Sequence, residues 1–152
     1  MTDFPTSLAE LGWGPFFQAQ LPAPDSDEAG LAPARVMAVH RGQLDIAGPV
    51  VSGRVTTLAE SGDDLDRPAV GDWLLMDPAA RRPVRLLARL SLFRRGAPGA
   101  ERRVQLIAAN VDTVFVVTSC NRDFNLARLE RYLTLAGEAG VRPVVVLTKV
   151  DL

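Results

Sequence analysis

The sequence predicts a small five-stranded β barrel followed by part of an α/β domain that has a parallel sheet. Short apolar segments separated by Gly, Pro and Asp fill residues 34–92, a pattern typical of a small barrel. A continuous apolar run at 114–117 suits a strand that is buried on both faces. A helical pattern and a second valine-rich segment at 143–147 follow, so the second half favours the order strand, helix, strand.

The composition indicates a globular protein. A chain of 152 residues with 47% apolar and 23% charged content fits one domain or two small ones. No window approaches the length of a membrane span, and residues 1–10 lack the basic and apolar regions of a signal peptide. The single Cys120 excludes a disulfide framework and any multi-cysteine zinc site within this chain.

The charge is divided unevenly along the chain. Residues 1–80 hold 12 acids and 4 arginines, a net charge of −8, whereas residues 81–152 hold 13 basic residues and 6 acids, a net charge of +7. Eight of the 16 arginines fall between positions 81 and 103, where the one acid is Glu101. A strip of one sign indicates a polyanionic partner. The alternative is a solvated arginine-rich surface in a proteome that is poor in lysine.

Residues 1–33 are expected to form a loosely structured lead-in. An apolar and aromatic group occupies its first half: Leu8, Leu11, Trp13, Phe16 and Phe17. A linker rich in Pro, Gly and acids follows. Because exposed aromatic side chains are unfavourable, we expect this group to cover the next domain.

Residues 34–92 contain the five predicted strands, at 34–40, 43–47, 50–57, 73–76 and 84–92. An acidic insertion between the third and fourth strands fits a barrel of the OB type. Such barrels often bind nucleic acid on one face. Trp73 lies inside a strand, so we expect it to fill the core.

Residues 93–110 are predicted to be a basic hinge between two domains. Gly96, Pro98 and Gly99 interrupt any regular structure, and arginines flank them.

Residues 111–152 predict one βαβ unit. A strand at 113–118 precedes a helix that Asn125 caps and Gly140 ends. Leu126, Leu129, Leu133 and Ala136 share one face of that helix. The crossover is expected to be right-handed and its strands parallel. Because one helix cannot cover both faces of a parallel sheet, we expect the sheet to be incomplete.

The second strand ends in Thr148-Lys149-Val150-Asp151, which matches the pattern [NT]-K-x-D. Guanine presents N1–H and an exocyclic amine side by side, and the Asp151 carboxylate would accept both. Lys149 would lay its aliphatic stem along the purine, and Thr148 would hold the loop by hydrogen bonds. In the alternative, Asp151 caps a following helix and Lys149 is solvated, since short motifs often match by chance.

The chain resembles the circularly permuted GTPases of the RsgA (YjeQ/YloQ) family. The resemblance starts near Arg35, includes Val70-Gly71-Asp72-Trp73, and is densest after Arg102. It lies in four segments there: 109–119, 121–125, 129–133 and 144–152. In that family the guanine motif precedes the phosphate-binding loop. Residues 1–152 contain [NT]-K-x-D but no G-x-x-x-x-G-K-[ST], which agrees with that order.

The resemblance implies a ribosome-assembly factor that binds the RNA of the small subunit near the decoding centre. It implies GTP and Mg²⁺ as cofactors, hydrolysis stimulated by ribosomes, and zinc in a C-terminal domain. The phosphate loop, the magnesium switches and the zinc ligands would all lie beyond Leu152. We therefore expect residues 1–152 to hydrolyse no GTP. We further expect a cytoplasmic monomer that contacts no membrane.

The candidate site residues form two groups, with no catalytic residue and no metal ligand. The guanine group is Thr148, Lys149 and Asp151. The RNA group is Arg94, Arg95, Arg102 and Arg103, supported by Arg81, Arg82 and Arg85. Two alternatives stay open. One is an OB-type RNA-binding module without nucleotide function, and the other is a different α/β nucleotide enzyme in which Asp151 contacts a ribose.

Overall fold

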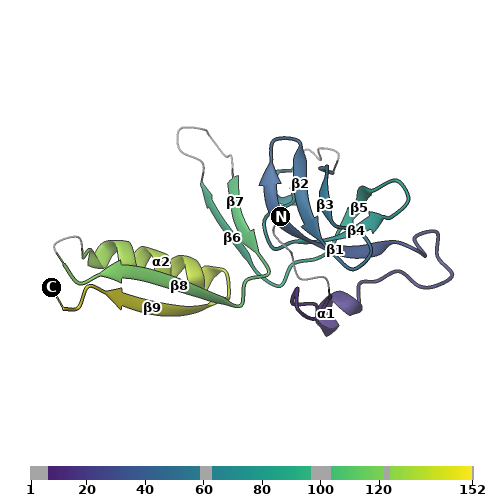
Figure 1. Ribbon diagram of the computed structural model, residues 1–152. Coiled ribbons are helices and arrows are strands. Elements are labelled where there is room, and N and C mark those ends of the chain that lie inside the picture. The colour runs from purple at the N-terminus through teal and green to yellow at the C-terminus, as the bar shows by residue number, and fades with distance from the viewer. Residues whose placement is uncertain (1–6, 59–62, 97–103, 122–123, 152) are drawn as a thin grey trace.

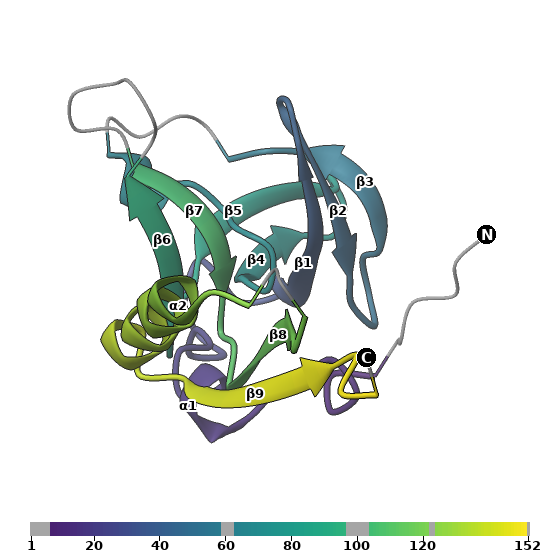
Figure 2. The same cartoon turned by 90° about the vertical axis from the view of Figure 1, so that its left-hand side faces the viewer.

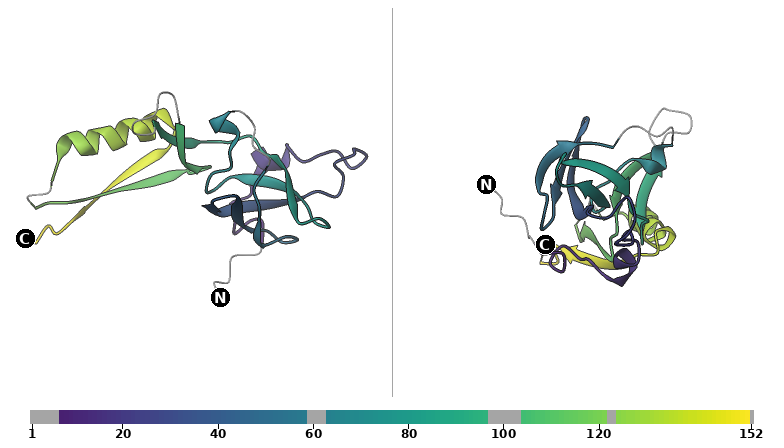
Figure 3. Two further views of the ribbon diagram at one scale, coloured as in Figure 1. Left: turned by 90° about the horizontal axis from the view of Figure 1, so that it is seen from above. Right: turned by 90° about the vertical axis from the view of Figure 1, so that its right-hand side faces the viewer.

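A computed structural model describes residues 7–58, 63–96, 104–121 and 124–151 (Figure 1). A curved sheet lies at one end, a βαβ unit lies at the other, and a β-hairpin stands between them (Figure 1). Seen from above, the βαβ unit projects away from the curved sheet (Figure 3).

The elements follow one another in the order that Figure 1 labels. The first half holds α1 (Pro15–Gln18), β1 (Ala32–His40), β2 (Gln43–Ala47), β3 (Gly53–Thr56), the 3₁₀ turn η1 (Asp64–Asp66), β4 (Trp73–Asp77) and β5 (Arg82–Leu86). The second half holds β6 (Leu92–Gly96), β7 (Val104–Ala109), β8 (Thr113–Ser119), α2 (Leu126–Glu138) and β9 (Arg142–Thr148).

The first five strands form one antiparallel sheet in the order β3-β2-β1-β4-β5. Strands are present at all five predicted positions, but the third and the last predicted strands were too long, because β3 covers only Gly53–Thr56 and β5 ends at Leu86. A closed OB-type barrel is not confirmed, since in the described part of the chain no ladder joins β3 to β5. Arg81 crosses there instead and donates from Nη2 to the carbonyl of Ser52, at 2.9 Å.

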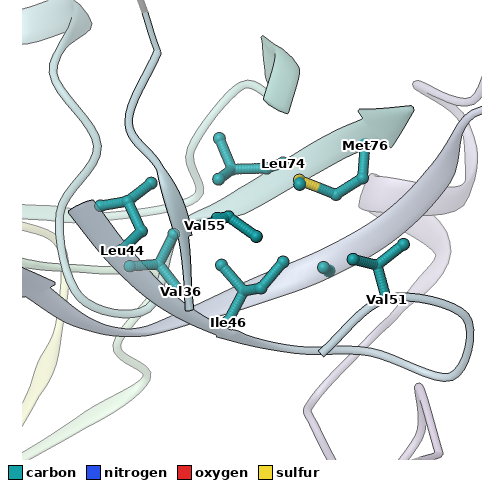
Figure 4. Close-up of a cluster of buried hydrophobic side chains, with 8 residues drawn as sticks. Val36, Leu44, Ile46, Val51, Val55, Leu74 and Met76 are labelled. Atoms are coloured by element: carbon teal, nitrogen blue, oxygen red, sulfur yellow. The ribbon is translucent and has the colours of Figure 1, made fainter. Parts of the chain in front are cut away.

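Alternate residues of the strands fill the inside of this curved sheet. Figure 4 shows the side chains turned toward one another: Val36, Leu44, Ile46, Val51, Val55, Leu74 and Met76. The period of two along each strand places six of them on one face, and Val51 joins them from the segment between β2 and β3. Burial of these side chains removes apolar surface from water and so stabilises the sheet.

The lead-in covers the other face of the sheet, as predicted. Leu11 and Phe17 are buried against Trp73 and Leu75. The ring of Trp13 meets Trp73 edge-on, with centroids 4.7 Å apart and planes at 79°. Trp73 has no exposed surface, which confirms that it fills the core.

The expectation that residues 93–110 lack regular structure was wrong. β6 and β7 pair in an antiparallel hairpin from Leu92↔Ala109 to Gly96↔Val104. Apolar residues at the start of β6 and along β7 favour pairing of the two strands. Of the predicted breakers, Gly96 is the last residue of β6, whereas Pro98 and Gly99 lie outside the described residues.

The βαβ unit agrees with the prediction in its elements. β8 and β9 pair in parallel from Thr113↔Arg142 to Ser119↔Thr148. The Asn125 side chain caps α2 by accepting a hydrogen bond from the Arg128 amide at 2.9 Å, and Gly140 follows the helix end with φ +66°.

The expectation that β8 is buried on both faces was wrong. Val116 is 8% exposed, whereas its neighbours Phe115 and Val117 are 66% and 63% exposed. Because side chains alternate along a strand, burial of every second residue means that a single face is covered. Figure 1 shows α2 along one side of the β8–β9 pair.

Candidate functional site

The turn after β9 lies beside the end of β8. The Cys120 amide donates to the carbonyl of Thr148 at 2.9 Å, and the Thr148 hydroxyl donates to the carbonyl of Thr118 at 3.4 Å. Parallel strands bring their carboxyl ends to one edge, which is where open α/β sheets bind ligands. Thr148 therefore ties the turn to the neighbouring strand.

Lys149 adopts a left-handed backbone conformation, with φ +54°. This conformation is uncommon for a residue other than glycine, and sequence reasoning missed it. Lys149 and Asp151 are both exposed, and within the described ranges neither forms an ion pair. Their charged groups are free to meet a ligand.

Three predicted RNA-binding arginines lie on or next to β5 and have internal partners. Arg81 donates to Ser52, and Arg82 lies 3.9 Å from a carboxylate oxygen of Asp77. The half-buried Arg85 donates to Glu28 and to the carbonyl of Gln20, each at 3.1 Å. These contacts attach β5 to neighbouring segments, the lead-in included.

Arg94 and Arg95 lie exposed on β6. Arg95 donates from Nε to the Gln105 side chain at 2.9 Å. Neither arginine pairs with a carboxylate among the residues that the structure describes. Arg102 and Arg103, the other two members of the predicted group, lie outside the described residues.

A groove of about 520 Å³ separates the β6–β7 hairpin from α2. Figure 2 shows α2 beside the hairpin. The lining of the groove includes the two arginines of β6 and three residues of α2 that sequence reasoning did not select: Arg131, Tyr132 and Glu138. The helical pattern marks only the apolar face of α2, so no local signal indicated that these residues meet the hairpin.

Two further arginines, Arg89 and Arg35, each connect distant segments through several hydrogen bonds. Arg89 forms two hydrogen bonds with the fully buried Asp72, at 2.8 and 2.7 Å, and also donates to the carbonyls of Leu65 and Arg67. Sequence reasoning counted Arg89 only as part of the basic strip.

Arg35 joins three distant segments by donating to the carbonyls of Leu11, Gly71 and Asn110. Its guanidinium also lies 5.8 Å from the centroid of the Trp73 ring. Burial lowers the pKa of Arg35, and the nearby carboxylates of Asp112 and Asp72 oppose that change.

An exposed cluster on β1, β2 and β3 joins Asp45 to two basic partners. Arg54 donates to Asp45 at 2.7 and 3.0 Å, and His40 Nε2 lies 2.9 Å away. Hydrogen bonds from Arg54, and then from His40, hold the pKa of the Asp45 carboxyl well below its usual range.

The described residues do not fit a metal site, because no group of three or more His, Cys, Asp or Glu gathers among them. We therefore assign neither Mg²⁺ nor zinc to them. Among the same residues, no helix combines the length and the apolar character needed to cross a membrane.

Comparison with known proteins gives consistent matches. Residues 86–152 match the RsgA GTPase family. The chain is 50% identical over 146 residues to a small ribosomal subunit biogenesis GTPase RsgA of Mesorhizobium japonicum, covering 95% of this chain and 40% of that protein. It is 50% identical over 145 residues to RsgA 2 of Vibrio parahaemolyticus, covering 95% and 38%. The chain is therefore similar to part of these RsgA proteins, and its residues 86–152 match the family model.

Two solved structures share the fold. YjeQ from Thermotoga maritima aligns with a TM-score of 0.57 and 20% identity, over 80% of this chain and 42% of that one. YloQ, described as a circularly permuted GTPase, aligns with a TM-score of 0.54 and 16% identity, over 85% and 44%. The chain spans about 40% of the length of the RsgA proteins from Mesorhizobium japonicum and Vibrio parahaemolyticus.

Proposed function

We propose that this chain is the N-terminal part of a GTPase that acts in maturation of the small (30S) ribosomal subunit. The observation that carries the proposal is the Thr148–Asp151 tetrad, exposed where two parallel strands end, in a chain 50% identical to proteins named for this function. The curved sheet and the arginines bind ribosomal RNA, and the tetrad recognises guanine. The protein acts in the cytoplasm as a monomer.

In the guanine site, Asp151 accepts two hydrogen bonds from the base and Lys149 covers the purine face. The exposure of both side chains and the tie from Thr148 to Thr118 support these roles. Adenine offers no such pair of donors, so the site discriminates between the two purines.

In the RNA site, Arg94 and Arg95 make the principal phosphate contacts, because they are exposed and have no carboxylate partner among the described residues. We assign the same role to Arg102 and Arg103 from the sequence. The β5 arginines (Arg81, Arg82 and Arg85) support the site from its side, with Arg85 contributing least because Glu28 already engages it.

Hydrolysis requires parts that residues 1–152 do not encode. Phosphoryl transfer needs a phosphate cradle, Mg²⁺ and an oriented water molecule. The longer protein uses GTP and Mg²⁺ and holds zinc in a C-terminal domain, whereas residues 1–152 alone hydrolyse no GTP. GTP hydrolysis by the purified 152-residue chain, if it persisted through repeated purification, would contradict the expected lack of activity.

Sedimentation with purified ribosomal subunits tests the RNA-binding role. The chain should sediment with small subunits at moderate salt, and Arg94→Glu with Arg95→Glu should abolish this. The matched control, Arg128→Glu with Arg142→Glu, reverses two exposed arginines outside the groove and should retain binding. Undiminished sedimentation of the first double variant would refute the role of the hairpin arginines.

Nucleotide competition tests the guanine site. In a longer chain that includes the phosphate loop, GTP but not ATP should displace a labelled guanine nucleotide, and Asp151→Asn should abolish the preference. Equal competition by GTP and ATP would instead favour a nucleotide enzyme in which Asp151 contacts a ribose. RNA binding with no nucleotide binding would favour a plain RNA-binding module.

A further inference from the structure

We propose that the groove between the β6–β7 hairpin and α2 holds a single RNA strand, with its phosphates on Arg94, Arg95 and Arg131 and one base on Tyr132. This inference rests on the proposed function and deepens it. It adds two residues of α2 to the RNA surface and specifies an unpaired strand rather than a duplex.

The groove has two walls that differ in origin. One wall is the hairpin, which places consecutive arginines at positions 94 and 95 of β6. The other wall is α2, which places Arg131 and Tyr132 opposite them. Its volume of about 520 Å³ falls within the range of about 300–1,000 Å³ that is usual for small-ligand sites. One or two nucleotides therefore fit between the walls.

The charges of the groove lack counterparts in the described part of the protein. Arg54, Arg67, Arg82, Arg85 and Arg89 each pair with a carboxylate. The three groove arginines do not, although Glu138 lies on the same lining. Guanidinium groups gathered without carboxylate partners are complementary to phosphates, which they bind through paired N–H donors. Glu138 should repel a phosphate and so limit the strand at its end of the groove.

Tyr132 supplies the feature that favours an unpaired strand. Its side chain is 44% exposed, and the Arg131 guanidinium lies 5.6 Å from its ring centroid. Bases of a single strand stack on aromatic rings, and arginine adds a cation–π contribution. Bases of an A-form duplex are stacked on one another and do not reach such a ring. An acidic peptide would use the arginines but gain little from the tyrosine.

Fluorescence anisotropy with labelled oligo(U) of about 10 nucleotides, within the usual site size of about 4–16, tests the proposal on the 152-residue chain. Arg131→Gln should weaken binding and reduce the slope of log K against log salt by about 0.7. Arg128→Gln, the same change one turn earlier on α2 and outside the groove, should leave both unchanged.

The aromatic contact has its own pair of variants. Tyr132→Leu should weaken oligo(U) binding roughly 5- to 150-fold, and Tyr132→Phe should preserve it because the ring remains. Thermal unfolding of each variant checks that the fold is retained, since Tyr132 also lines an apolar pocket against β8. An RNA duplex of similar length should bind more weakly than oligo(U).

The outcomes separate this inference from the proposed function. If Arg94→Glu with Arg95→Glu abolishes subunit binding while the Arg131 and Tyr132 variants bind oligo(U) like the parent, the hairpin role stands and the groove proposal is wrong. If none of these variants loses binding, both fail. Preference for duplex RNA, or equal displacement of oligo(U) by polyglutamate, would also overturn the groove proposal.

Discussion

Replacing Gly71 by alanine should destabilise the junction between the curved sheet and the β6–β7 hairpin. Gly71 has φ +91°, and an added Cβ would lie 2.1 Å from the carbonyl oxygen of Ala109. The left-handed backbone costs an alanine about 1–2 kcal/mol. Moving Ala109 away also disturbs the bond from its amide to Val70, now 2.8 Å, and the one from Arg35 to the Gly71 carbonyl. Each of these two hydrogen bonds contributes about 0.5–1.5 kcal/mol. Together with the backbone cost, the free energy of unfolding should fall by about 2–5 kcal/mol.

Urea unfolding measured by circular dichroism tests this estimate, with Gly30→Ala as the matched control. Gly30 has a similar φ of +98° but nothing within 4 Å of the added Cβ. It should therefore lose only the backbone contribution of about 1–2 kcal/mol. The difference between the two variants measures the close approach of Ala109. Equal losses in the free energy of unfolding would refute this account of the junction.

Three other changes follow from contacts described above. Arg89→Met leaves the buried Asp72 carboxylate unpaired and should reduce the free energy of unfolding by about 3–5 kcal/mol, and Asp72→Asn in the same chain should recover part of that loss. Trp13→Ala uncovers one edge of the Trp73 ring and should cost about 2–4 kcal/mol, with a shift in tryptophan emission as a second readout. Because the pKa of Asp45 is lowered in the folded protein, its contribution to stability is present above about pH 4 and lost as the pH falls further. The melting temperature of the parent should therefore fall more steeply below about pH 4 than that of Asp45→Asn, and parallel curves would contradict this.

Local patterns were sufficient to predict most elements of the fold. The cap at Asn125, the stop at Gly140 and the strand alternation act over a few residues, so the sequence alone reveals them. The β6–β7 hairpin was missed because its breakers suggested an irregular segment, whereas pairing between strands decides the structure there. The open edge between β3 and β5 likewise depends on pairing that no local pattern records.

In the candidate site, too, local features were predictable and contacts between distant segments were not. The tetrad at 148–151 is contiguous, so its residue types and its place after a strand could be predicted together. The partners of each arginine could not, since Arg85 meets Glu28 across 57 positions of the chain. Arg131 and Tyr132 were not selected because their importance depends on where α2 lies relative to the hairpin.

The position of Arg35 has a consequence for the kinetics of folding. Its three carbonyl acceptors lie 24, 36 and 75 residues away along the chain, in the lead-in, before β4 and after β7. All three segments must be in place before the guanidinium has its partners, so these contacts should be largely absent from the folding transition state. Interactions formed after the barrier slow unfolding without accelerating folding. We therefore expect Arg35 to slow unfolding more than it accelerates folding.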